Sequence, residues 1–189
     1  LQSYEDEFNL PTTSYKTPAE PRKILSQVEE GQEVNAKEQK VFRSAVGKLL
    51  HMMRWSRPEI WNAVRECSRK MTKCNHQHMK AVHRTMKYCV ETKDRGWILN
   101  PEGNWIWSNK DFKFQIEGTS DSNFATCPET RHSVTGLVVK LNKSTVSVKS
   151  GMQKIVAISV TEAETIAMVQ CVQELSLIHI SEPTRREGI

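Results

Sequence analysis

The sequence predicts an α+β or α/β protein in which a small helical bundle is followed by three strands and one more helix. Between residues 37 and 95, apolar residues recur every three or four positions, which is typical of amphipathic helices. From residue 111 onward they alternate with polar residues, as in strands. The length of 189 residues, of which 38% are hydrophobic, suits one ordinary domain or two small ones.

Composition excludes several classes of protein. No apolar run approaches the roughly 18 residues of a membrane span, and the N-terminal residues lack the basic and apolar stretches of a signal peptide. The five cysteines are odd in number and form no C-x-x-C pair, so neither a disulfide framework nor a zinc ribbon is expected. These features predict a soluble intracellular protein with reduced thiols.

The positive charge is concentrated in one segment. Residues 1–36 carry 3 basic and 7 acidic side chains, whereas residues 37–95 carry 15 basic and 5 acidic ones, a net charge of +10. Such a segment is typical of nucleic-acid binding, although solvated helices can also be basic.

The first unit is predicted from its lead-in and three helices. Residues 1–36 are polar, contain three prolines and predict an extended, partly disordered lead-in that forms little core. An amphipathic helix is expected over residues 36–55. A second helix begins at Pro58 with Ser56 as its N-cap, and a third runs from about Asn75 to Val90. Short turns between them predict a bundle.

The second unit is predicted from three strands and a capping box. Residues 96–110 predict a linking hairpin with a turn at residues 101–104. Strands are expected around residues 112–121, 134–141 and 146–148. Ser159 and Glu162 then match a capping box that opens a helix.

Asp121 and Glu162 are the candidate catalytic and metal-binding residues. Asp121 ends an alternating strand, and Glu162 lies in the first turn of the helix that follows the strands. If that helix crosses the sheet, the two carboxylates form a hard-oxygen site for Mg²⁺. Both residues also have ordinary structural explanations, since a glutamate in a capping box satisfies its own helix and an aspartate at a strand end makes a turn.

Basic side chains on the helices are candidate nucleic-acid contacts. They are expected to contact the phosphates of a nucleic acid, with affinity that falls steeply with salt, while some of them only solvate the bundle. The candidates are Arg54, Arg57, Lys73, Lys80, Arg84 and Lys87.

Cys74, His76 and His78 do not have the spacing of a tetrahedral zinc motif. Trp105 and Trp107 suit either base stacking or a core, and core is the commoner use.

Six short motifs occur in order along the chain: residues 42–50 (FRSAVGKLL), 54–64 (RWSRPEIWNAV), 78–89 (HMKAVHRTMKYC), 119–125 (TSDSNFA), 130–136 (TRHSVTG) and 153–164 (QKIVAISVTEAE). Together they resemble Copia-type LTR-retrotransposon Pol polyproteins. The three motifs of the first unit resemble the thumb and connection region of the reverse transcriptase, and the three of the second resemble the ribonuclease H domain.

The resemblance implies a fold, a site and a reaction. The second unit would be the N-terminal half of a ribonuclease H-like fold, and Asp121 and Glu162 would be the first two of four carboxylates that hold two Mg²⁺ ions. Glu164, about 200° around the helix from Glu162, would be solvent-exposed or structural. The family's second aspartate in this strand is replaced by Asn123, and Thr165 departs from the family's aromatic residue.

The implied reaction is Mg²⁺-dependent hydrolysis of the RNA strand of an RNA/DNA hybrid. Implied partners are a hybrid or template-primer and the remainder of the Pol polyprotein, with a cytoplasmic virus-like particle as the location. The remaining carboxylates are expected beyond residue 174, which predicts that this chain alone is inactive. No Tyr/Phe-x-Asp-Asp motif of a polymerase palm is present.

Three alternatives remain. A nucleic-acid-binding module would need no carboxylates, a transposase or integrase of the same fold superfamily would carry its glutamate on a later helix, and a degenerate product would do nothing.

Residues 175–185 resemble a translated sequencing adapter. The expected divisions are therefore 1–36, 37–95, 96–110, 111–174 and a sequencing artefact at 175–189.

Overall fold

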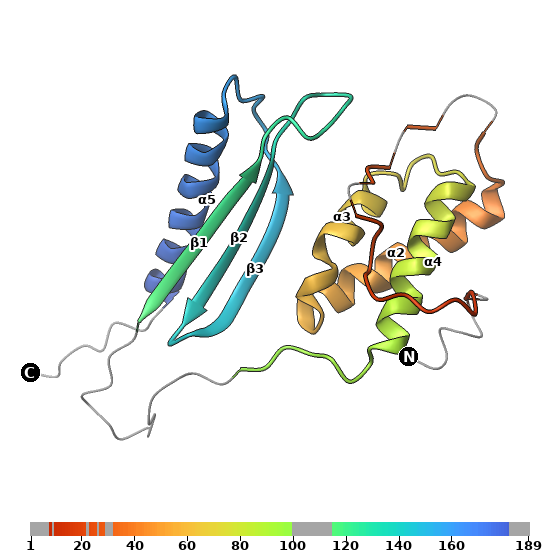
Figure 1. Cartoon of the computed structure of the whole chain (residues 1–189), viewed down its shortest axis with the longest axis horizontal. Helices are drawn as coiled ribbons and strands as arrows, with labels where there is room; N and C mark the ends of the chain where they lie inside the picture. The colour runs from red at the N-terminus through yellow and green to blue at the C-terminus, as the bar shows by residue number, and fades with distance from the viewer. Residues whose placement is uncertain are drawn as a thin grey trace, which may run out of the picture. The chain divides into compact units, whose positions relative to one another are not determined.

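The computed structural model describes residues 8, 10–21, 23–25, 27–28, 32–99 and 115–181, with side chains through residue 177. The chain divides into two compact units, Leu1–Trp97 and Ile98–Ile189, each of which is described by itself. The α+β class is confirmed: Figure 1 shows helices in the first unit and a three-stranded sheet with one helix in the second. No helix in the described ranges is long and apolar enough to cross a membrane.

The first unit is built from α2 (Ala36–Trp55), η1 (Pro58–Ile60), α3 (Trp61–Ser68) and α4 (His76–Glu91). α2 begins in a capping box, because Asn35 Oδ1 accepts the Glu38 N–H at 2.8 Å and the Glu38 carboxylate accepts the Asn35 N–H at 3.3 Å. The predicted apolar faces meet in the core, where Phe42, Leu49 and Val82 are fully buried.

The connection after α2 differs from the prediction. Ser56 is not an N-cap; it ends α2, and its Oγ donates to the Met52 carbonyl at 3.2 Å. Pro58 opens a single 3₁₀ turn rather than an α-helix, and Arg57 before it has the extended φ that a proline favours in its predecessor. The α-helical hydrogen bonding begins at Trp61.

The lead-in adds more to the core than its composition predicted. Phe8, Leu25 and Val34 are 5%, 7% and 9% exposed and belong to the same apolar cluster as the helices. The prediction of little core is therefore wrong for these three residues. It was based on the polar composition of the whole segment, which does not reveal single buried apolar residues. Residues 10–21, which we call the strap, are non-helical as predicted.

The second unit contains β1 (Ile116–Asn123), β2 (Val134–Leu141) and β3 (Ser144–Met152), antiparallel in the order β1-β2-β3. Asn142 and Lys143 connect β2 to β3 with φ angles of 47° and 64°, which are typical of a type I′ turn. β1 pairs with β2 in regular register from end to end. Its side chains therefore alternate between the two faces of the sheet.

α5 (Val160–Ser181) packs along one face of this sheet (Figure 1). Ala163, Ala167 and Cys171 are its buried residues, and Cys171 clusters with Leu137 and Val139 of β2. A Cβ on Gly118 would lie 2.6 Å from Cys171 Sγ, so the missing side chain is what allows α5 to approach β1 this closely.

Two expectations concern regions at the margins of the described structure. Of the linking hairpin, residues 96–99 are described and have no regular secondary structure, while the remainder, with Trp105 and Trp107, lies outside the described residues. α5 runs without a break past the expected boundary at residue 175, and Leu175 packs against the Leu137–Val139–Cys171 cluster.

Candidate functional site

Asp121 lies on β1 with an exposed side chain. It is paired with Gly136 of β2, and a Cβ on Gly136 would meet nothing within 4 Å. Gly118 faces α5, and residues an odd number of positions apart on a regular strand face opposite ways. The Asp121 side chain therefore leaves the strand on the face opposite to α5.

Glu162 caps its own helix. Its N–H donates to Ser159 Oγ at 3.1 Å, and its carboxylate accepts the Ile158 N–H at 2.7 Å. Of the two explanations that the sequence allowed, the structure shows this capping role. The expectation that Glu162 lies beside the strands is not met, because Glu162 is about 180° around α5 from Cys171, which packs on β2.

Glu164 is the acidic residue of α5 that reaches β1. It shares one stripe of the helix with Cys171 and Leu175, the two residues nearest to Gly118. Its half-buried carboxylate accepts the Ser122 backbone N–H at 3.3 Å. The Ser122 nitrogen forms the peptide bond with the carbonyl carbon of Asp121. The Glu164 carboxylate is therefore hydrogen-bonded to the residue that directly follows Asp121. The sequence analysis did not assign Glu164 to the site. The small residues Ala163 and Ala167 were the sequence signal for the side of α5 that packs on the sheet.

The donors at this edge of β1 have suitable chemistry for Mg²⁺ but are few. Asp121 and Glu164 offer carboxylate oxygens, the ligands that Mg²⁺ prefers. The nearby Ser122 Oγ is buried and has no hydrogen-bond partner. Among the described residues, however, no group of three or more His, Cys, Asp or Glu could hold a metal ion. The described residues therefore do not form a complete metal site by themselves.

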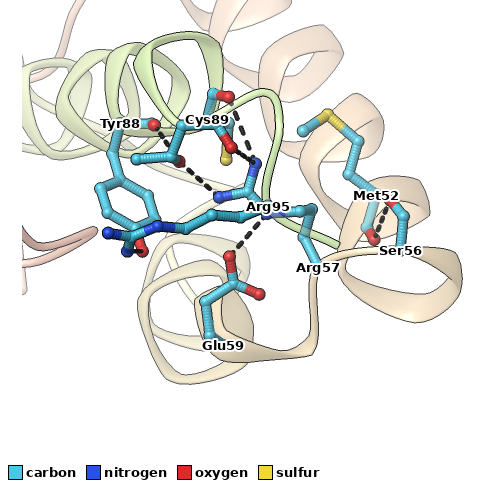
Figure 2. Close-up of polar contacts among 8 residues, drawn as sticks. Met52, Ser56, Arg57, Glu59, Tyr88, Cys89 and Arg95 are labelled. Carbon is cyan, nitrogen blue, oxygen red and sulfur yellow. Dashed lines mark hydrogen bonds and ion pairs between the residues drawn. The ribbon is translucent and has the colours of Figure 1, made fainter. Parts of the chain in front are cut away.

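Arg57 has a structural position, contrary to the expectation that it contacts phosphate. It is 3% exposed, and Figure 2 shows its guanidinium enclosed by neighbouring groups of the first unit. It donates to the Glu59 carboxylate at 2.6 Å and to the carbonyls of Cys89 and Thr92 at 3.2 and 3.1 Å. A guanidinium with these partners joins η1 to the end of α4 and is closed to a ligand.

The other candidate cations differ in how far they are engaged. Arg84 and Lys87 are only 20% and 15% exposed at the side chain, and Lys87 lies 3.8 Å from the Glu91 carboxylate. Lys73 is 62% exposed but pairs with Glu33 at 2.9 Å. Lys80 and Arg54 are exposed. Of the six predicted contacts, these last two are exposed and have no ion pair to another described residue.

Sequence reasoning missed the outer face of α2. This face lies opposite the buried stripe and is defined by Lys37, Lys40, Arg43, Ser44, Gly47, His51, Arg54 and Trp55, all exposed. Trp55 is 70% exposed and lies against the His51 ring, with centroids 6.5 Å apart. The only acidic residue of α2, Glu38, lies on the other side, in the capping box. The sequence signal for this face was the set of polar positions between the apolar ones in the amphipathic pattern of residues 36–55.

Comparisons with known proteins place the chain among curated sequences. It is 30% identical over 145 residues to Secreted RxLR effector protein 161 of Plasmopara viticola, covering 77% of this chain and 94% of that protein. It is 30% identical to the Retrovirus-related Pol polyprotein from transposon TNT 1-94 of Nicotiana tabacum, over 71% of this chain. The similar protein from transposon RE2 of Arabidopsis thaliana is 29% identical over 72% of this chain.

The match to the Pol polyproteins is confined to a short segment of them. The chain spans 9% of the length of each of these two polyproteins. No family model matches the chain, and no solved structure matches it. By its identity and its coverage, the chain belongs to the family of RxLR effector protein 161 of Plasmopara viticola, and it is distantly related to the Pol polyproteins of Copia-type retrotransposons.

Proposed function

We propose that this chain is the part of a Pol-derived protein in which a nucleic-acid-binding helical unit precedes the first half of a ribonuclease H domain. The observation that carries the proposal is the Glu164 carboxylate held on the Ser122 N–H, one peptide bond from Asp121. The order of three antiparallel strands and a packed helix, together with the relation to Pol polyproteins, supports the same interpretation.

In the intact protein, Asp121 and Glu164 would each supply carboxylate oxygens to Mg²⁺, and the bound metal would supply an activated water for cutting the RNA strand of a hybrid. Glu164 takes this role instead of Glu162, whose carboxylate is used at the helix terminus. Asp121 leaves β1 on the face opposite to α5, whereas Glu164 reaches β1 from α5, so the edge of β1 is where both carboxylates can reach one ion.

The described residues hold too few ligands for the reaction, so we expect no hybrid cleavage by this chain. The assay is Mg²⁺-dependent release of fragments from a hybrid labelled on its RNA strand. Cleavage by the wild-type chain that Asp121→Asn abolishes would contradict a partial site.

The outer face of α2 is the proposed nucleic-acid interface of the first unit. From Lys40 to Arg54 it extends about 21 Å at 1.5 Å per residue. Its cations suit a phosphate backbone, and the absence of a carboxylate leaves their attraction unopposed. Ser44 and Gly47 have small side chains, so the backbone of a nucleic acid can approach the middle of the face closely. Trp55 offers a ring for base stacking.

The test is fluorescence anisotropy of a labelled hybrid across a salt series. We expect Lys40→Glu and Arg54→Glu each to lower the slope of log affinity against log salt by about 1 or more. Trp55→Ala should weaken binding about tenfold, corresponding to about 1–3 kcal/mol per stacked base. Lys93→Glu, a charge reversal at an exposed lysine outside α2, is the matched control. Equal losses in Lys93→Glu and Lys40→Glu would contradict a localised interface.

Cellular location is not part of the proposal. The sequence predicted an intracellular protein, whereas the name of the Plasmopara viticola relative describes a secreted one.

A further inference from the structure

The strap surrounds Arg84 of α4 with oxygen atoms. Arg84 Nε donates to the Thr17 carbonyl at 3.3 Å and Nη2 to Thr17 Oγ1 at 2.9 Å, while Nη1 lies 4.0 Å from the Glu20 carboxylate. The Tyr15 ring covers the face of the guanidinium at 4.6 Å. This arrangement of oxygens at the edge and a ring on the face is how a guanidinium binds a nucleotide phosphate beside a base.

Three further hydrogen bonds hold the strap on α4. The Glu91 carboxylate accepts the Ser14 hydroxyl and the Tyr15 N–H, both at 3.0 Å. Thr85 Oγ1 donates to the Pro18 carbonyl, also at 3.0 Å. These contacts are polar, and the Glu91 and Arg84 contacts are at the exposed surface, while Leu10 and Tyr15 of the strap pack against the core only partly buried.

The segments on either side of the strap are held differently. Phe8 precedes it, and Leu25 and Val34 follow it, all three buried in the core of the unit. Exposed polar contacts contribute about 1 kcal/mol or less each, whereas buried apolar side chains contribute about 1.5–3 kcal/mol. The strap can therefore lift from α4 by a local opening while its ends remain anchored.

We infer that the strap and a nucleic-acid phosphate compete for the same position on Arg84, so that the chain covers part of its own nucleic-acid surface until the strap lifts. The inference rests on the proposed nucleic-acid binding. A phosphate supplies the same three-oxygen arrangement as Thr17 and Glu20, with more charge, and each phosphate contact releases a counterion. Arg84 would then be a phosphate contact on α4, in addition to those on the outer face of α2.

The test compares hybrid affinity in a released variant, Thr17→Val with Glu20→Gln, which removes the Thr17 hydroxyl and the Glu20 charge from Arg84 and leaves the buried anchors in place. The matched control is Thr13→Val with Glu117→Gln, which makes the same chemical changes away from Arg84. We expect the released variant to bind about threefold to tenfold more tightly than the control, with a salt slope steeper by about 1.

Arg84→Gln is then made in both backgrounds. It should remove the gain in the released variant and change the affinity of the native chain little. Equal affinities of released and control variants, or a native chain that Arg84→Gln weakens as much as Lys40→Glu, would overturn the inference. If no variant binds a hybrid, the proposed function fails as well, whereas binding that is indifferent to release refutes the competition alone.

Hydrogen exchange tests the lifting of the strap without nucleic acid. The Tyr15 amide, bonded to Glu91, should exchange at least 100-fold faster than the Val34 amide, which donates to the Cys74 carbonyl at 3.1 Å. Equal protection of the two amides would show that the strap opens only with the whole unit, and this would overturn the inference.

Discussion

Replacing Gly118 tests the close approach of α5 to β1, on which the position of Glu164 depends. In Gly118→Ala the new Cβ would lie 2.6 Å from Cys171 Sγ and 2.9 Å from Leu175 Cδ1, both closer than real Cβ contacts. Either the helix moves away from the strand or the two side chains turn. Gly136→Ala on the neighbouring strand is the matched control, because its Cβ would meet nothing within 4 Å.

Two opposing terms set the expected magnitude. Alanine is favoured over glycine within a strand by about 0.5–1 kcal/mol, and this gain applies to both variants. Overpacking in Gly118→Ala costs about 1–3 kcal/mol. We therefore expect Gly136→Ala to stabilise the second unit by about 0.5–1 kcal/mol and Gly118→Ala to lie about 2 kcal/mol below it.

Hydrogen exchange measured by mass spectrometry across a urea series isolates the second unit. Peptides covering β2 report the change, and peptides from α2 in the first unit serve as an internal reference. Adding Cys171→Ala to Gly118→Ala should recover part of the loss, since one of the two clashing atoms is removed. Equal stability of the two glycine variants would refute the close packing of α5 on β1.

The other predictions concern features of both units. Arg57→Lys should destabilise the first unit by about 2–4 kcal/mol in denaturant titrations, because an ammonium cannot reproduce the buried contacts to Glu59, Cys89 and Thr92; an unchanged midpoint would contradict the structural role. Lys143→Gly should raise the stability of the second unit by about 1 kcal/mol by relieving a φ of 64°, and a loss would argue against the type I′ turn. Burial raises the pKa of the Cys67 and Cys89 thiols to about 12, from 9.0. Both thiols should resist thiol reagents at pH 8, and rapid labelling of the native protein would be the contrary result. The free energy of unfolding should fall as pH rises from 9 toward 12, because the thiols of the unfolded chain release their protons at lower pH than those of the folded chain.

The sequence predicted those elements that depend on local patterns. β2 was expected over residues 134–141 and occurs there, since a valine-rich run in a central strand needs no further information. The capping residues of α5 were likewise readable at Ser159 and Glu162. Ser56 was misassigned because the same residue type suits the end of one helix and the start of another, and only the path of the chain decides between them.

The candidate site was less predictable, because it depends on which side of α5 meets which strand. Glu162 and Glu164 are separated by two residues, and the sequence pattern offers both. The choice follows from the small residues Gly118, Ala163 and Ala167, which set the contact between helix and strand. For the cations, exposure was decisive: Arg57 is buried by partners that lie 32 and 35 residues away, at Cys89 and Thr92, and no local pattern reports them.

The central claim is that Asp121 and Glu164 form part of a metal site at the edge of β1. Its most direct test is a titration with Mn²⁺, which favours the same carboxylate ligands as Mg²⁺ and broadens nearby amide resonances in NMR spectra. We predict broadening of the Asp121 and Ser122 amides that is lost in Asp121→Asn and in Glu164→Gln but kept in Glu162→Gln. Broadening centred on the Ile158 amide and abolished by Glu162→Gln would contradict the claim.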